Sequence, residues 1–227
     1  MTVRGLAALG AIVAAAMIGC PPAAAAPACG DFGATPDTGQ TCQLHTDGTG
    51  YTVDIRFPAD YPDSAPLLSY LATQRTQFLD YVASFPPVDR PMPYELSITS
   101  TVYRSGTPDA GTESVVVRVG QDVGAHPVSS VRTFSYDLGA QRPITFDTLF
   151  TPGSQPLDII YPLVRRQFEQ TMGGQPVRGG LDPETYQNFA ITDDAVVFYF
   201  DQDQLFGQNE GPLQVSVPRA DLAAVLA

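Results

Sequence analysis

The histidines of this 227-residue chain are the first residues to consider for acid–base chemistry, because there are only two of them. His126 stands in the stretch VGAHPVSS. Pro127 favours an extended conformation at His126, and Gly124 permits a tight backbone just ahead of it. This pattern predicts a bend between two strands, with His126 as a structural residue and as a candidate binding residue. The alternative is a weak secreted esterase in which His126 activates a serine.

Other catalytic or metal-binding patterns find little support in the sequence. His45 lies in a polar segment and is predicted to be a solvated loop residue. The nucleophile-elbow pattern G-x-S-x-G does not occur, and the two histidines lack the spacing of zinc ligands. In DQDQLFG, Leu205 stands where a calcium loop needs an oxygen ligand. The sequence therefore predicts no catalytic residue, no metal site and no cofactor.

The first 25 residues have the pattern of a secretory signal peptide. Arg4 supplies a positive charge, Leu6 to Ile18 is almost wholly apolar, and small residues lead to a cleavage site between Ala25 and Ala26. The apolar run of about 13 residues is shorter than the ~20 that span a bilayer, and no later run is longer. We expect a secreted, extracellular protein without a membrane span. A lipid anchor through Cys20 is the alternative.

Removal of the leader leaves two of the three cysteines, Cys29 and Cys42. An even pair in an oxidising compartment predicts a disulfide, and a bridge closing a loop of about 14 residues contributes roughly 3 kcal/mol to stability.

The net charge limits the classes of molecule that the protein can bind. Loss of Arg4 changes the net charge from −12 to −13, and no lysine is present. So acidic a surface disfavours binding to nucleic acid, which requires basic residues.

Apolar periodicity predicts a mixture of strands and helices. The alternation in YTVDIRF predicts a half-buried strand over 51–57. Apolar residues at helical spacing, among them Leu67, Leu71 and Phe78, predict a helix from Ser64 to Phe85. Further strands are predicted in YELSITSTVYR, ESVVVRV, SSVRTFSYDLG, FAITDDAVVFYF and LQVSVP. Further helices are predicted in LDIIYPLVRRQFEQTM, kinked or restarted at Pro162, and in RADLAAVL.

These elements do not alternate as regular βαβ units. They predict an α+β fold with an antiparallel sheet packed against two main helices. We expect four regions: the signal peptide over 1–25, a disulfide-stapled N-terminal segment over 26–50, an N-terminal α+β lobe over 51–119 and a C-terminal lobe over 120–227.

Several stretches resemble known families. GAHPVSSVRTFSYDLGAQRPITFDTLF and FAITDDAVVFYFDQDQLFGQNEGPLQVSVPRADL resemble the extracytoplasmic domain of RsiV-type lysozyme-sensing anti-sigma factors, the DUF3298 family. DTGQTCQ, YPD, PYELSITS and LDPETYQNFAIT extend the likeness, because they are similar to the mycobacterial secreted immunogenic proteins of MPT/MPB type. The resemblance implies a secreted α+β protein with an RsiV-like lobe over 120–227, recognition by host immunity and no accepted catalytic mechanism. Some relatives carry an esterase label.

These observations lead to one functional expectation. We expect a secreted, non-enzymatic, immunogenic binding protein that is a monomer. Its partner is a host or envelope protein or a glycan, and His126 is the candidate binding residue that the sequence offers.

Overall fold

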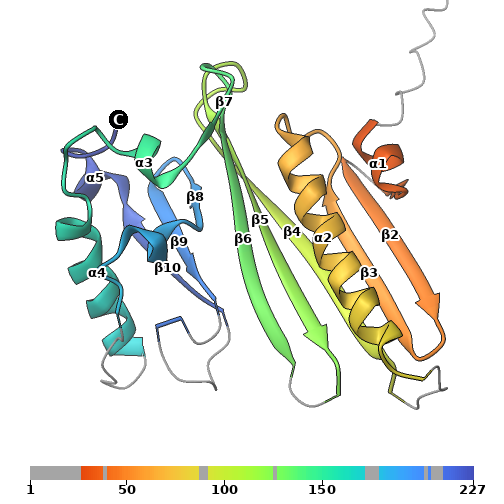
Figure 1. Cartoon of the computed structure of the whole chain (residues 1–227). Coiled ribbons are helices and arrows are strands. Elements are labelled where there is room, and N and C mark those ends of the chain that lie inside the picture. The colour runs from red at the N-terminus through yellow and green to blue at the C-terminus, as the bar shows by residue number, and fades with distance from the viewer. Residues whose placement is uncertain are drawn as a thin grey trace, which may run out of the picture.

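The computed structural model describes residues 27–37, 40–86, 92–124, 127–171, 179–201, 204–205 and 212–227, and it forms two β-sheets with helices on their outer sides (Figure 1). In chain order the elements are α1 (Pro27–Phe32), β1 (Thr35–Pro36), β2 (Thr41–Gly48), β3 (Tyr51–Pro58), α2 (Ser64–Ala83), β4 (Tyr94–Ser105), β5 (Thr112–Asp122), β6 (Val128–Asp137), β7 (Arg142–Ile144), α3 (Phe146–Leu149), α4 (Leu157–Thr171), the 3-10 helix η1 (Pro183–Tyr186), β8 (Phe189–Ile191), β9 (Ala195–Phe200), β10 (Leu213–Pro218) and α5 (Arg219–Leu222).

The large sheet contains strands β1 to β7 in sequence order. All neighbours are antiparallel except β3 and β4, which run parallel because α2 carries the chain back between them. The buried side of α2 places Leu67, Leu71 and Phe78 against the apolar residues of the strands, among them Ile55 and Ile98. The predicted strand over 51–57 and the predicted helix are thus confirmed, and they pack against each other.

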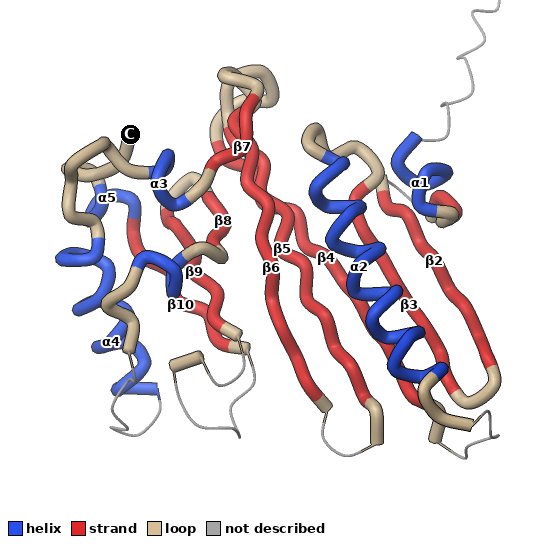
Figure 2. The backbone as a smooth tube through the Cα atoms, in the orientation of Figure 1, coloured by secondary structure: helices blue, strands red, loops and turns tan. Residues whose placement is uncertain are grey.

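The small sheet has the order β10-β9-β8 and lies beside β6, between the large sheet and α4 (Figure 2). Its strand β9 is buried along most of its length, as its nearly continuous apolar sequence requires. Phe198 and Phe200 pack with Ile160 and Val164 of α4 in a second core. The predicted helix is present as α4, which continues through Pro162 without restarting.

The two sheets meet through buried hydroxyl groups. Within the small sheet β8 is an edge strand, and its outward backbone groups need partners. Thr133 Oγ1 accepts a hydrogen bond of 2.8 Å from the backbone N–H of Phe189, and Ser114 Oγ accepts one of 3.1 Å from Ile191. Ser135 donates to the carbonyl oxygen of Phe189 at 3.2 Å. The edge of β8 is therefore satisfied by side chains of β5 and β6.

Side chains next to β8 and β9 in turn bind the outward backbone groups of β6. Beyond the short β7, β6 also presents outward backbone groups. The N–H of Val131 donates to Asp201 Oδ1 at 2.6 Å, and the N–H of Thr133 donates to Asn188 Oδ1 at 3.1 Å. Burial raises the pKa of Asp201, and this hydrogen bond opposes the rise. We give one name, the hydroxyl seam, to all the side-chain contacts that join the two sheets along β6 and β8. They are made by Ser114, Thr133, Ser135, Asn188 and Asp201.

At the other end of the large sheet, the disulfide predicted between Cys29 and Cys42 is present. It joins α1 to β2, and both cysteines are buried. The region around it is more regular than expected, because the polar segment pairs with β3 and forms β2. His45 is therefore a strand residue, and its prediction as a loop residue is wrong.

The remaining helices and strands are of the type predicted from the sequence. The hairpin β4–β5 and the strands β6, β8, β9 and β10 lie in the predicted stretches. The closing helix is shorter than expected, because α5 ends at Leu222 and Leu226 instead forms a β-bridge with Phe150. No helix in the described part of the chain is long and apolar enough to cross a membrane.

The hydroxyl seam yields a stability prediction. Thr133→Val keeps the side-chain shape but leaves the buried N–H of Phe189 without an acceptor, which should lower the free energy of unfolding by about 1–3 kcal/mol. Urea unfolding measures the change. The control is Thr101→Val on the exposed part of β4, where we expect a change within about 0.5 kcal/mol. Equal losses in the two variants would contradict the role of the seam.

Candidate functional site

Several residues selected from the sequence lie outside the described residues. These are His126, which follows the end of β5, and Cys20, Ala25 and Ala26 at the N-terminus. The structure therefore adds nothing to the candidate binding role of His126 or to the position of leader cleavage. His45 is the histidine whose surroundings are described.

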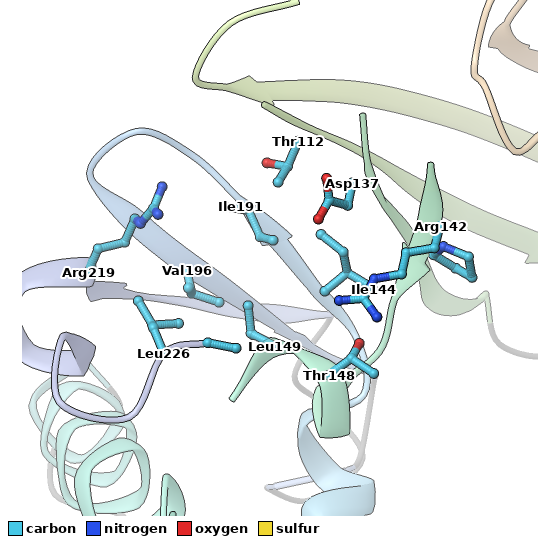
Figure 3. Close-up of a pocket in the computed structure, with 12 residues that line it drawn as sticks. Thr112, Asp137, Arg142, Ile144, Thr148, Leu149, Ile191, Val196, Arg219 and Leu226 are labelled. Carbon is cyan, nitrogen blue, oxygen red and sulfur yellow. The ribbon is translucent and has the colours of Figure 1, made fainter. Parts of the chain in front are cut away.

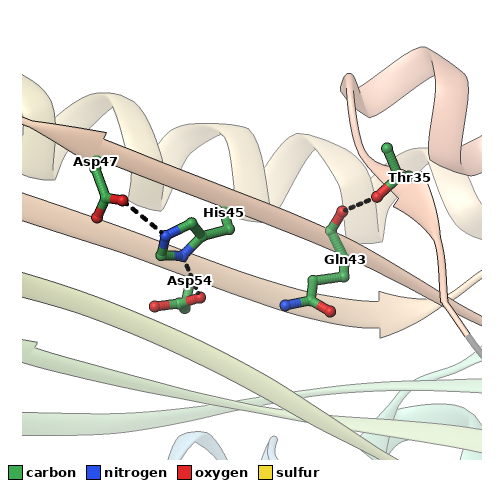
Figure 4. Close-up of polar contacts among 5 residues, drawn as sticks. All are labelled: Thr35, Gln43, His45, Asp47 and Asp54. Atoms are coloured by element: carbon green, nitrogen blue, oxygen red, sulfur yellow. Dashed lines mark hydrogen bonds and ion pairs between the residues drawn. The ribbon is translucent and has the colours of Figure 1, made fainter.

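His45 lies between two carboxylates on the side of β2 that faces away from α2 (Figure 4). Its Nδ1 is 2.8 Å from Asp54 Oδ1 on β3, and its Nε2 is 3.1 Å from Asp47 Oδ2 on β2. Two hydrogen bonds raise the pKa of His45. The bond to Asp54 has the larger effect and the bond to Asp47 the smaller one. We call these three residues the histidine cluster. Both ring nitrogens are engaged, which favours the positively charged imidazolium.

The register of the sheet bears on whether the histidine cluster could act as a hydrolase site. His45 pairs with Asp54, and Asp54 pairs with Ser97 on β4. The carboxylate thus lies between the imidazole and the serine, whereas a catalytic triad requires the imidazole in the middle. The row His45–Asp54–Ser97 does not have the geometry of a triad.

A second group of charged residues surrounds two adjoining hollows near the end of β3. One hollow, of about 290 Å³, is lined by Asp60, Arg104, Ser105 and Glu113 among others. The other, of about 470 Å³, shares Asp60 and Arg104 and adds Arg56. We call the two hollows together the Arg104 cavity. Its lining is rich in groups that can form hydrogen bonds; the rest of the second hollow is formed by Gln40, Thr41, Pro58, Thr99, Ser100 and Val102.

Glu113 is the most unusual residue of the Arg104 cavity. Its side chain is 7% exposed, and its Oε2 accepts a hydrogen bond of 2.9 Å from Nε of Arg104. Its Oε1 is buried and has no hydrogen-bond partner among the described residues. The Tyr61 hydroxyl is also buried without a described partner, and burial, with the charges of Asp63 and Glu113, raises its pKa. A buried carboxylate oxygen without a donor is costly, so a binding partner that donates to it would be favoured.

Glu113 is not among the site residues predicted from the sequence, although the sequence contains a signal for it. In ESVVVRV, Glu113 is two and four residues from Val115 and Val117, so the three side chains share one face of β5. Those valines belong to the core beneath α2. A carboxylate on an otherwise apolar strand face indicates a buried charge, which requires a partner. The partner, Arg104, lies directly across on β4.

A third hollow, of about 250 Å³, lies between the large sheet, α3 and the C-terminus. Figure 3 shows Arg142 and Arg219 on opposite sides of it, with Ile144, Val196 and Leu226 between them. Arg219 already donates to Ser105 Oγ at 3.0 Å and to the carbonyl oxygen of Thr192. We therefore regard this guanidinium as part of the connection between the sheets. Within the described ranges no group of three His, Cys, Asp or Glu residues is arranged to hold a metal ion.

The histidine cluster yields a titration prediction. The pKa of His45 should lie above its ordinary value of 6.5, and Asp54→Asn should lower it more than Asp47→Asn does. NMR titration of the imidazole protons measures both changes. Because the pKa is raised by folding, the cluster stabilises the protein fully below pH 6.5, and this contribution is lost as pH rises through the folded-state pKa. Asp80→Asn on the exposed side of α2 should leave the titration unchanged, and a His45 pKa below 6.5 would contradict the arrangement.

Solved structures with a similar fold belong to the DUF3298 family. A DUF3298 family protein from Pseudomonas aeruginosa PAO1 has a TM-score of 0.55 at 15% identity and covers 82% of this chain and 94% of its own. One from Bacteroides fragilis NCTC 9343 has a TM-score of 0.52 at 14% identity, covering 82% and 93%. At these identities the likeness concerns the fold alone. The family model described as protein of unknown function (DUF3298) matches residues 147–220.

Sequence relatives cover almost the whole chain. Esterase Rv3036c of Mycobacterium tuberculosis H37Rv is 44% identical over 221 residues, which is 96% of each protein. Immunogenic protein MPT64 of the same organism and immunogenic protein MPB64 of Mycobacterium bovis are each 40% identical over 195 residues, covering 84% of this chain and 85% of the relative. By this identity and coverage, the chain belongs to the MPT64/MPB64 family of mycobacterial immunogenic proteins and carries a DUF3298 domain in its C-terminal part.

Proposed function

We propose that this protein is exported, loses its leader after Ala25 and acts outside the cell as a non-enzymatic binding protein. Three observations support the proposal. The first 25 residues have the composition of a signal peptide, and the chain contains a disulfide, which persists in oxidising compartments. Its relatives include proteins named immunogenic. The acidic surface makes nucleic acid a poor partner.

The observation that carries the binding proposal is the buried Oε1 of Glu113 beside the Arg104 cavity. This oxygen can only accept a hydrogen bond, and the described residues provide no donor. Arg104 holds the other oxygen and sets the orientation of the carboxylate. Glu113 lines the cavity, and a ligand hydroxyl that displaced the groups closing off Oε1 would satisfy this oxygen without the cost of burying a new charge.

Among the expected partners, a glycan fits the Arg104 cavity best. Its volume is in the range of small-ligand sites, and its lining combines apolar surface with side chains that accept and donate hydrogen bonds. Asp60 and Glu113 accept hydrogen bonds from sugar hydroxyls, and the guanidinium groups of Arg56 and Arg104 donate to sugar oxygens. We therefore propose a neutral glycan of the envelope or of the host as the ligand.

The proposal is tested by titrating the mature protein with neutral di- and trisaccharides, followed by ¹⁵N NMR. We expect shifts at residues of the Arg104 cavity, and a loss of affinity of at least tenfold in Glu113→Gln and Arg56→Gln. Arg166→Gln, on the exposed side of α4, is the matched control and should bind as the wild type does. Saturable binding that all three variants retain would place the ligand elsewhere, and no saturable binding would refute a glycan ligand.

A weak esterase is the second candidate, because one relative is named an esterase. In that case His126 or His45 would act as general base. We expect no ester hydrolysis dependent on either histidine, because both nitrogens of His45 are engaged by carboxylates and the sequence has no nucleophile elbow. A short-chain nitrophenyl ester assay compares the wild type with His126→Ala and His45→Ala. A rate above background that His126→Ala abolishes, with folding unchanged, would replace the binding proposal with the esterase.

A further inference from the structure

The outer edge of β2 is open over part of its length. The strand β1 pairs with β2 only at Cys42 and Gln43. Two backbone hydrogen bonds show which way alternate residues point: Gln40 O accepts from Ala59 at the end of β3, whereas Thr41 O accepts from Asp37 next to β1. Alternation continues along a regular strand.

This alternation directs the N–H and C=O groups of His45 and Asp47 outward, away from β3. Neither residue has a backbone partner on that side among the described residues. His45, Thr46 and Asp47 are all exposed. The open edge, which we define as residues 45–47 of β2, thus offers two donors and two acceptors in the geometry of a β-ladder.

The edges of β6 and β8 that face each other differ from this open edge. The outer edge of β6 is closed by Asp201 and Asn188, which bind its backbone N–H groups. The edge of β8 is closed by hydroxyls. Natural proteins protect exposed edges in such ways because an open edge pairs with other chains. At the open edge of β2, the side chain of His45 bonds to the carboxylates of Asp47 and Asp54, and these side chains leave the outward backbone groups uncovered.

Charge determines which strand can pair there. With His45 protonated, the histidine cluster has two carboxylates and one cation, and Asp47 is 71% exposed. The whole chain has a net charge of −12 and no lysine. A second copy of so acidic a protein is repelled, whereas a basic strand is attracted.

We infer that the open edge of β2 accepts an extended peptide segment of another protein by strand addition, with an arginine or lysine side chain beside Asp47. The backbone groups of His45 and Asp47 provide the ladder hydrogen bonds, and the carboxylate selects the basic side chain. The open edge lies at the end of β2 away from Thr41, which lines the Arg104 cavity. The inference therefore does not depend on the proposed glycan ligand.

The test uses the mature protein and a ten-residue peptide of alternating threonine and arginine. We expect saturable binding by fluorescence anisotropy, with slowed amide hydrogen exchange at His45 and Asp47. A peptide of alternating threonine and glutamate controls for charge. Two further peptides test the backbone hydrogen bonds: one carries N-methyl groups on every threonine, the other on every arginine. Both keep the charge, but only one of them loses the N–H groups that face β2. Binding that is equal for both methylated phases and the parent would overturn strand addition.

Two substitutions separate backbone from side chain. Asp47→Asn removes the charge and keeps the N–H, whereas Asp47→Pro also removes the outward N–H, which is tolerated at an edge strand. We expect at least a threefold loss of affinity for Asp47→Asn and a further tenfold loss for Asp47→Pro. Thermal unfolding checks that both variants fold, and the methylated peptides decide the question if the proline variant does not. Three outcomes would each overturn the inference. They are equal affinity in the two variants, peptide-induced shifts confined to the Arg104 cavity, and dimerisation through the open edge in place of peptide binding.

Discussion

The need to satisfy buried backbone groups at two sheet edges is the constraint on which this structure depends. The strands β6 and β8 lie close together but do not form a common ladder; instead Thr133, Ser114, Asn188 and Asp201 bind the outward groups of the opposite strand. A buried N–H without an acceptor is expensive, so the small sheet can dock only where these side chains meet it. The positions of β9, β10 and α4 follow from that contact, because they pack in turn on β8.

The same constraint leaves part of the molecule uncovered. The small sheet contacts β4, β5 and β6, so the side of β2 and β3 opposite α2 has no layer over it in the described part of the chain. Polar side chains occupy this surface, and the histidine cluster joins β2 to β3 across it. The cluster therefore acts first as a connection between strands. Its engagement of both imidazole nitrogens explains why an exposed histidine in this position is a poor general base.

Charge is organised differently inside and outside the protein. Over the whole chain acidic groups outnumber basic ones, 24 to 12, which gives an electrostatic field that attracts cationic groups. Inside, Glu113 is paired with Arg104 but retains one oxygen that the described residues do not satisfy. Natural proteins seldom leave such an atom unpaired without a reason, and the charged residues Asp60 and Arg104 beside it in the Arg104 cavity are consistent with recognition of a ligand group.

The amino-acid sequence by itself determined the elements whose pattern is local. Alternation in YTVDIRF specified β3, helical spacing of Leu67, Leu71 and Phe78 specified α2, and the cysteine pair Cys29 and Cys42 specified the disulfide. Only the tertiary structure decided the parallel pairing of β3 with β4, the strand position of His45 and the burial of Glu113. The physical reason is that these properties depend on partners distant in sequence. A polar segment becomes a strand when a neighbour supplies its ladder, and a glutamate can be buried when an arginine lies across from it.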